Sequence, residues 1–476
     1  MNQAVCLSNN SYCCLTIRII IMVLMFLHDV DKLNAQLPIV HLYSNNILSS
    51  DFSSGHFCLD DTISVDADIR YRGASSLKKT KKSFALKLKT EHGEKLDTAL
   101  LGMRSDNSWI LDAMAIDVAR MRNRVSMDLW NDFSSESYVQ AKEVSALNGT
   151  RGRFVELYLN DEYWGLYCLS EKIDRKQLKL KKSKNEEQKG ALYKSVTWST
   201  LFSKDYNFYL YDNSSARWNG WEMSYPDKDL DGAGNWEPLS EMIHWLSYAH
   251  NEDINDSLVY KIDIPVWQDY FLLMEFICAE DNICKNQYVY FYDTSKENKM
   301  LGVAPWDMDH SWGRDYKGDI TEKTSCTFPC TPIYNRVCQI LTSEYVCLET
   351  SFEARYAQLR DTFFSADRLK ERFNQYFKLF RDSGADERET ARWSGVDGID
   401  LNFAGEQAYI ENWIDGRLKY MDKKYKYTET SIASYSKRDD HSSTHIYNIS
   451  GLKVDNNNLN GLPKGIYIIN GKKVLK

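Results

Sequence analysis

Residues 279–315 read AEDNICKNQYVYFYDTSKENKMLGVAPWDMDHSWGRD, and this stretch decides the fold. The runs Gln287–Tyr292 and Lys299–Ala304 are short, largely apolar and bounded by polar residues, which predicts two β-strands. Turn-forming residues lie between the runs, so the strands should form a hairpin. Oxygen-bearing side chains stand immediately before and after this hairpin, which makes it a candidate for holding a functional site.

The polar residues flanking the hairpin have a spacing that indicates phosphoryl-transfer chemistry. Asp281 and Asn286 are five residues apart, like the Asp that orients the acceptor hydroxyl and the Asn that holds a metal ion in protein kinases. Asp307 and Asp309 follow the hairpin, where kinases carry a metal-binding Asp. Hard divalent cations prefer carboxylate and amide oxygens. We therefore predict Asp281 as the catalytic carboxylate and Asp307, Asn286 and Asp309 as metal ligands; the alternative is that they cap turns or are solvated.

Strand-like and helix-like patterns separate along the rest of the chain. The alternation in Ser83–Lys89 places Phe84, Leu86 and Leu88 on one face, which predicts a half-buried strand. Further elements are expected as strands at Asp66–Gly73, Trp109–Leu111, Phe154–Leu159 and Tyr163–Leu169, and as helices at Asp117–Phe133, Leu239–Tyr248, Val266–Ala279 and most of Glu353–Tyr425. The prediction is an α+β, protein-kinase-like fold with two lobes, a β-rich N-lobe over about 37–170 and a helical C-lobe over about 171–440. In the helical region, only the hairpin is expected to form strands.

Length and charge limit the classes of protein. The 476 residues suffice for two or three domains or one large two-lobed domain, and the hydrophobic share of 43% is ample for a core. Lys+Arg 59 against Asp+Glu 67 gives a net charge of -8. A chain of this charge lacks the basic surface of a nucleic-acid-binding protein. We expect an ordered enzyme or binding domain and no nucleic acid partner.

Five motifs occur in order between about residues 65 and 425. They are YRGASS with KKSFALKLK, SWILDAMAIDVARMRNRVSMDL, ELYLNDEYWGLYCLSEKID, LYK at 192–194, and KNQYVY with APWDMDHSWG. In this order they resemble the motifs of the spore coat protein H (CotH) kinase family, an atypical branch with a protein-kinase-like fold. The resemblance implies ATP-dependent phosphorylation of Ser or Thr in a protein substrate with Mg or Mn, Asp281 as the catalytic carboxylate and Asp307 as a metal ligand.

Two lysines are candidates for contacting the ATP phosphates. Kinases place an Ala and a Lys two residues apart on one strand face, and Ala85 and Lys87 reproduce this spacing. Lys87 is therefore the choice from the spacing. The family resemblance favours Lys82 instead, so both remain candidates.

Three further residues are assigned to ATP binding. The chain lacks a GxGxxG loop, and Arg72 with Gly73 is expected to replace it with a guanidinium and backbone amides. Glu171 is expected where the lobes join, in contact with adenosine or its ribose. The helix residues Arg122 and Asn123 offer no counterpart to the Glu that pairs with the kinase lysine, which puts that ion pair in doubt here.

The N-terminal segment predicts export. Nine apolar residues, 19–27, follow Arg18 and form too short a run to span a bilayer, but they suit the core of a signal peptide. We assign residues 1–36 to a signal peptide with cleavage near Ala35; an uncleaved anchor or a buried helix is the alternative. The expected location is the periplasm, the cell surface or the extracellular space, with membrane contact only through this segment or a surface anchor. Eight cysteines remain after its removal and could pair, although isolated buried thiols are favoured.

The C-terminal segment, residues 441–476, differs from the body of the chain. Asn470-Gly471 between two β-rich runs predicts a hairpin. The ending LPKGIYIINGKKVLK resembles the C-terminal sorting modules of exported Bacteroidetes proteins. We therefore expect a small β module with a secretion or sorting role, or an ordinary hairpin appendage.

Two other hypotheses compete with an active kinase, and one acidic loop is considered separately. The chain could be a kinase-shaped adhesin or scaffold, because ATP is scarce outside cells. Asp307 and Asp309 could be a glycosidase pair with Trp306 and Trp312 as sugar platforms. The stretch DKDLDG at 227–232 opens like a calcium-binding loop, but Pro238 stands where the loop needs its bidentate Glu.

Overall fold

The computed structural model describes most of the chain. The described residues are 36–428, except 47, 61, 185–186, 198–209, 228–233, 298, 322–323 and 326–334, together with 446–448, 466–469 and 472–475. The predicted signal segment up to residue 35 and most of the DKDLDG stretch lie outside these residues. The chain forms two compact units, Met1–Tyr427 and Thr428–Lys476, and each is described by itself.

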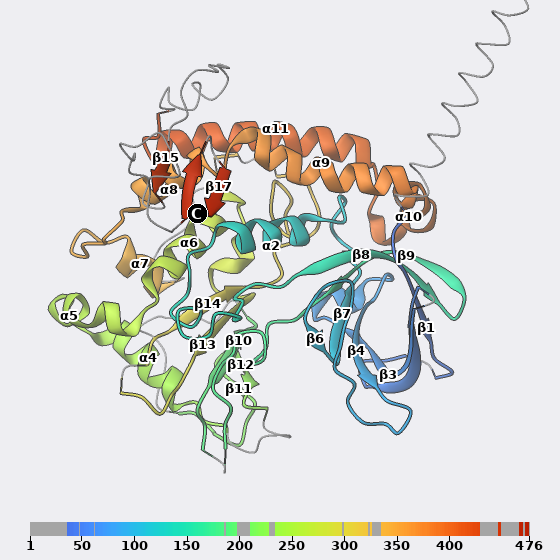
Figure 1. Ribbon diagram of the computed structural model, residues 1–476, viewed down its shortest axis with the longest axis horizontal. Coiled ribbons are helices and arrows are strands. Elements are labelled where there is room, and N and C mark those ends of the chain that lie inside the picture. Colours follow the sequence, from blue (N-terminus) through green and yellow to red (C-terminus); the bar gives the residue numbers. More distant parts are fainter. Residues whose placement is uncertain are drawn as a thin grey trace, which may run out of the picture. The chain divides into compact units, whose positions relative to one another are not determined.

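Seven strands of the first unit close into a barrel, drawn in blue to blue-green in Figure 1. In pairing order they are β1 (Ile39–Tyr43), β2 (Ser53–Leu59), β3 (Ile63–Arg72), β4 (Ser83–Lys89), β7 (Ser108–Asp112), β9 (Glu162–Ser170) and β8 (Gly152–Leu159). All neighbouring strands are antiparallel except at the closure, where β1 pairs in parallel with β8. The short strands β5 (Thr98–Ala99) and β6 (Ser105–Asp106) form a separate pair.

The barrel interior follows from the alternation of apolar residues along its strands. On β4, the side chains of Phe84, Leu86 and Leu88 are each 0% exposed, so the predicted strand and its buried face are confirmed. The strands predicted at Phe154–Leu159 and Tyr163–Leu169 are also present, as the hairpin of β8 and β9, with Asn160 and Asp161 at positive φ in its two-residue turn.

Helix α2 (Arg122–Phe133) begins five residues later than the sequence pattern predicts. The carboxylate of Asp117 accepts hydrogen bonds from the backbone N–H groups of Met121 and Arg122, at 2.8 and 2.7 Å. Asp117 therefore caps the first turn from outside the helix. The intervening residues form turns.

A five-stranded sheet follows the barrel in the sequence. Its strands, in spatial order, are β11 (Arg217–Trp218), β12 (Trp221–Tyr225), β10 (Ala191–Ser195), β13 (Gln287–Phe291) and β14 (Gly302–Pro305). The predicted hairpin is confirmed as β13 and β14. The expectation of no other strands in this region was wrong. Trp221, Met223 and Tyr225 of β12 are buried in alternation, a strand pattern that the sequence analysis missed, whereas β11 has only two residues. In this sheet β10 pairs with β13, β12 pairs with β10, and β11 pairs with β12.

Helices make up most of the remaining first unit. They are α4 (Glu237–Tyr248), α5 (Asn251–Lys261), α6 (Ile264–Phe276), α7 (Arg336–Leu341), α8 (Phe352–Asp361), α9 (Ala366–Ser383), α10 (Ala385–Trp393) and α11 (Phe403–Lys424), with 3-10 helices η1 (Ser75–Lys78), η2 (Glu280–Ile283) and η3 (Val396–Gly398). Helices α9 and α11 lie side by side (Figure 1). Of the helices in the described part of the chain, none combines the length and the apolar character needed to cross a membrane.

The first unit is thus a mixed α+β structure, as predicted. Its barrel and its helical part belong to the same compact unit. Their identification with the two lobes of a kinase stays a prediction. In the second unit, β15 (Ile446–Asn448), β16 (Ile466–Ile469) and β17 (Lys472–Leu475) form an antiparallel sheet. The pairing of β16 with β17 confirms the predicted hairpin; the sorting role stays a prediction.

Candidate active site

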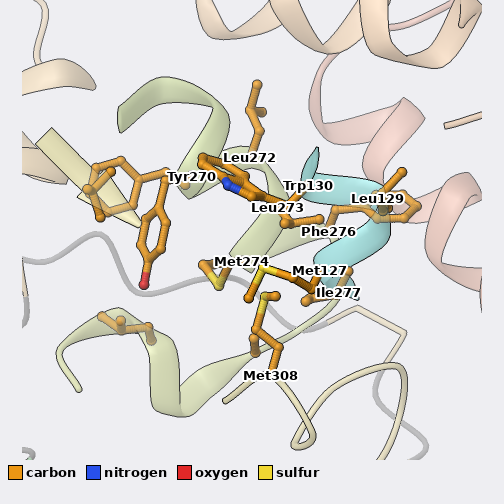
Figure 2. Close-up of a cluster of buried hydrophobic side chains, with 14 of the residues drawn as sticks. Met127, Leu129, Trp130, Tyr270, Leu272, Leu273, Met274, Phe276, Ile277 and Met308 are labelled. Atoms are coloured by element: carbon orange, nitrogen blue, oxygen red, sulfur yellow. The ribbon is translucent and has the colours of Figure 1, made fainter. Parts of the chain in front are cut away.

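The loop that follows β14 is held in the core by Met308. Its side chain is 0% exposed and lies close to Met127 of α2 and to Met274 and Ile277 of α6 and its end (Figure 2). The backbone N–H of Met308 also donates to Oδ1 of Asn123, at 3.1 Å. Asp307 and Asp309 directly precede and follow Met308 in the sequence. The buried side chain of Met308 therefore fixes the backbone from which both carboxylates project.

Buried charges hold the next part of this loop. Arg122 on α2 donates from Nε to the carbonyl of Ser311 at 3.1 Å and from Nη1 to Asp117 at 2.7 Å. Glu406 on α11 accepts hydrogen bonds from both Arg122 and Arg314. The loop from Asp307 to Arg314 is therefore fixed by α2 and α11 together. The residues at the start of α2, in which sequence reasoning found no kinase counterpart, position the predicted metal loop.

Asp281 lies in η2 and is joined to this loop. Its Oδ2 is 2.6 Å from Nζ of Lys285 and 3.1 Å from Nδ1 of His310. Burial alone would raise the pKa of Asp281, but the hydrogen bonds from His310 and Lys285 lower it below its ordinary value. Asp281 is thus ionised, as a residue that accepts a proton or orients a hydroxyl must be. The sequence analysis did not identify His310 as a site residue. The only indication in the sequence was that His310 directly follows Asp309.

Asn286 lies next to the loop through its backbone. Its φ is +56°, and its carbonyl accepts hydrogen bonds from the N–H of Trp306, at 3.1 Å, and from Nδ2 of Asn282, at 3.0 Å. Trp306 immediately precedes Asp307. The structure therefore brings Asp281, Asn286, Asp307 and Asp309 into one neighbourhood, although they come from both sides of the β13–β14 hairpin.

The acidic residues of this neighbourhood repel one another. Burial and the negative charges of Asp307, Asp112 and Asp117 raise the pKa of Asp309 to about 7, although His310 opposes the shift. A divalent cation would relieve this repulsion. The described residues contain no group of three or more Asp, Glu, His or Cys side chains that could hold a metal by themselves. Magnesium commonly takes only one or two carboxylates and completes its shell with phosphates and water, so the residues fit a metal bound together with a nucleotide.

The raised pKa of Asp309 makes a prediction about stability. Its folded-state pKa of about 7 exceeds the ordinary value of about 3.9, so stability falls as pH rises between these two values. We expect Asp309→Asn to raise the free energy of unfolding by about 1–2 kcal/mol at pH ~8 without metal, and by much less at pH ~5. Urea unfolding across this range is the measurement. Asp319→Asn, at an exposed position, is the control; a gain independent of pH would contradict the prediction.

Two basic side chains converge on Trp306. The guanidinium carbon of Arg72, at the end of β3, is 5.7 Å from the centre of the Trp306 ring, and Nζ of Lys194, on β10, is 5.8 Å from it. Burial lowers the pKa of Lys194, and the negative charge of Asp307 acts in the opposite direction. Within the described part of the chain, neither cation has a salt-bridge partner. Two cations near Asp307 without such partners fit the phosphates of a nucleotide.

Lys194 was not among the predicted site residues. Its signal was the short LYK motif at 192–194, whose strand character was not recognised. Pairing in the sheet places Lys194 opposite Tyr288, and its Nζ is 5.8 Å from the centre of that ring. Lys194 therefore lies on the strand adjacent to the hairpin that carries the acidic residues.

Gly73 follows Arg72 and has a φ of +127°. A Cβ atom at this position would lie 1.9 Å from Oγ of Ser76. The tight turn into η1 therefore requires glycine. The turn places the backbone of Gly73 and the start of η1 beside Arg72. This arrangement is compatible with the predicted phosphate-binding role of Arg72 and Gly73, which stays a prediction.

The remaining predicted ATP residues lie in other surroundings. Nζ of Lys82 donates to the carbonyls of Leu77, at 2.6 Å, and Lys79, and so closes η1. Lys87 is exposed on the barrel, with Nζ 4.4 Å from the centre of the Phe52 ring.

Glu171 is buried and bound by arginines. It accepts hydrogen bonds from the side chain of Arg151, at 2.7 Å, and from the backbone N–H of Arg104, at 2.9 Å. Through these hydrogen bonds, the buried carboxylate of Glu171 links the segments that contain Arg104 and Arg151. Among the described residues, Arg72 and Lys194 are the cations that lie over the Trp306 ring, and the ATP roles of Lys82, Lys87 and Glu171 stay predictions.

Comparisons with known proteins agree with the sequence motifs. A family model described as "CotH kinase protein" matches residues 69–421. The inner spore coat protein H of Bacillus subtilis (strain 168) is 23% identical over 256 residues, which are 54% of this chain and 61% of that protein. The chain thus spans about three fifths of the length of this curated relative.

Proposed function

The chain belongs to the CotH kinase protein family, and from this premise we propose that it is an exported protein kinase. It would transfer the γ-phosphate of ATP to a Ser or Thr hydroxyl of a secreted or surface protein. The observation that carries this proposal is the convergence of Asp281, the Asp307–Asp309 loop and the cations around Trp306. The barrel and the helical part would then correspond to the two lobes of a kinase.

Each residue of the cluster has a role in the proposed reaction. Asp281 orients the acceptor hydroxyl and accepts its proton as the oxygen–phosphorus bond forms and the bond from the γ-phosphorus to the leaving ADP oxygen breaks. Asp307, Asp309 and Asn286 would hold Mg or Mn, which neutralises charge on the phosphates when bound. Lys194 and Arg72 would bind the phosphate oxygens. Most of the rate gain would come from positioning and charge neutralisation.

Export is supported by two features outside the site. The predicted signal segment precedes the described residues, and the C-terminal unit resembles sorting modules. In addition, Cys338 is disulfide-bonded, and disulfides are typical of oxidising compartments. Among the described residues, Cys58, Cys168, Cys284 and Cys347 are free thiols. We propose a location in the periplasm, at the cell surface or outside the cell.

Nucleotide binding tests the proposal and separates the candidate lysines. We expect Mg-ATP to raise the melting temperature of the parent protein, because a ligand that binds only the folded state stabilises it. Lys194→Met should weaken Mg-ATP affinity about 10- to 100-fold, the cost of losing a charge-assisted phosphate contact. Lys87→Met is the matched control. The melting temperature without ligand is measured for each variant as well.

The outcomes of this experiment are distinct. Loss of Mg-ATP affinity in Lys87→Met but not in Lys194→Met would show that Lys87, the lysine favoured by the strand spacing, binds the phosphates. No response of the parent to Mg-ATP or Mn-ATP would contradict the kinase proposal. The chain would then be interpreted as a kinase-shaped adhesin or scaffold.

A further inference from the structure

Two large apolar side chains are exposed immediately after the predicted metal loop. Tyr316 is 62% exposed and Ile320 is 53% exposed. They lie in the loop 314–320, which leaves the fixed segment around Arg314. Single exposed apolar residues are common on protein surfaces, but two in one short loop beside a reactive site need an explanation.

The loop is held in one conformation by its own hydrogen bonds. Oδ1 of Asp315 accepts from the N–H groups of Lys317, at 2.8 Å, and Asp319, at 3.0 Å. Nη1 of Arg314 donates to the carbonyl of Gly318 at 2.9 Å, and Arg314 is itself bound by Glu406. Tyr316 and Ile320 are therefore presented by a turn that needs little ordering when a partner binds.

The loop adjoins the candidate catalytic residue. The ring of Tyr316 is 6.4 Å, centre to centre, from the ring of His310, and the two ring planes are inclined at 62° in an edge-to-face arrangement. His310 in turn lies 3.1 Å from the carboxylate of Asp281. Tyr316 is therefore at most about 11 Å from this carboxylate, and an extended chain advances about 3.3–3.6 Å per residue. A polypeptide with its hydroxyl at Asp281 reaches Tyr316 about three residues away.

We propose that Tyr316 and Ile320 form an acceptor platform, which binds a large apolar side chain of the protein substrate about three residues from its phosphorylated Ser or Thr. The inference rests on the proposed kinase function and adds the class of substrate. Its occupant is a polypeptide segment because the platform is continuous with the site that must admit the acceptor hydroxyl. Its side chain is apolar because the side chain of Ile320 and the ring of Tyr316, over which Nζ of Lys317 lies at 5.5 Å, expose apolar surface that would be removed from water on binding.

A peptide series tests this platform. Each peptide carries one Ser and one Leu in a background of small polar residues, with the Leu moved by one position at a time on both sides of the Ser. For the parent we expect a KM about tenfold lower when the Leu is about three residues from the Ser than for the Leu-free peptide. The double variant Tyr316→Ser/Ile320→Ser should lose this preference. Fluorescence anisotropy of the same labelled peptides on Asp281→Ala protein measures binding without turnover.

Matched controls separate the platform from general surface effects. Val259→Ser/Tyr260→Ser removes two side chains that are each 55% exposed on α5, and this variant should retain the parent's Leu preference. The melting temperature and its Mg-ATP shift verify that each variant is folded. Parent protein that phosphorylates peptides without regard to Leu position overturns the platform and leaves the kinase function standing. A Leu preference that survives in the Tyr316→Ser/Ile320→Ser variant also overturns it, and a parent that transfers no phosphate removes both proposals.

Discussion

Asp281→Asn and Asp307→Asn are each expected to lower the rate of phosphoryl transfer at least about 10³-fold. Asparagine at 281 keeps the shape of the side chain but cannot accept the hydroxyl proton, and general base catalysis alone contributes about 10²–10⁴-fold. Asparagine at 307 removes a negative charge that the metal ion needs. The measurement is the transfer of labelled phosphate from Mg-ATP or Mn-ATP to the protein itself or to co-exported proteins.

The two variants should differ in their dependence on metal. Asp281→Asn should retain the Mg-dependent rise in melting temperature with ATP, whereas Asp307→Asn should lose most of it. Asp256→Asn on the surface of α5 is the matched control and should behave like the parent. Equal labelling by the parent and both site variants would refute the assignment of these two carboxylates.

Glu389→Gln is expected to reduce the free energy of unfolding by about 3–5 kcal/mol, since it breaks a buried ion-pair network. Glu389 on α10 contacts Nζ of Lys81 at 2.6 Å and Nε of Arg120 at 2.7 Å, and it accepts a hydrogen bond from the N–H of Leu166. Lys81 and Arg120 are each 2% exposed. The neutral amide would leave the buried guanidinium of Arg120 without its carboxylate partner and would force Lys81 either to stay charged without a partner or to lose its proton.

Urea denaturation of the parent and of Glu389→Gln measures this loss. The control is Glu387→Gln, an exposed position on the same helix. Burial lowers the pKa of Lys81 to about 7 even though Glu389 opposes the shift. Without Glu389 this pKa should fall further, so Lys81 sheds its proton and part of the loss is recovered at high pH. A loss below about 1 kcal/mol at neutral pH would show that the network is not important for stability.

Local sequence pattern was sufficient to predict which acidic residues lie near one another around the hairpin, although their roles stay predictions. Asp281 and Asn286 are close together in the sequence. The β13–β14 hairpin then folds the chain back, so that Asp307, which follows β14, lies near them. Such a site needs only one correctly predicted hairpin. The apolar spacing in β4 likewise identified a buried barrel face, because alternation along one strand is a local property.

The basic half of the site depends on contacts between distant segments. Several lysines near β4 have similar sequence surroundings, and local pattern does not show which cation lies near Trp306. Lys82 binds backbone carbonyls, whereas Lys194 lies on β10, which the sequence analysis did not identify as a strand, and pairing with β13 brings it to Trp306. Glu171 illustrates the same limit, since its arginine partners become neighbours only in the folded chain.

The parallel pairing of β1 with β8 has a consequence for the integrity of the first unit. Strand β1 starts at Ile39, only a few residues beyond the predicted signal segment, and it occupies the gap between β2 and β8. Proteolytic trimming past Tyr43 would remove it and leave two strands with open backbone edges. Open edges recruit strands from other molecules, so a chain trimmed in this way would tend to aggregate. As long as residues 39–43 are present, they keep the edges of β2 and β8 paired and prevent such association.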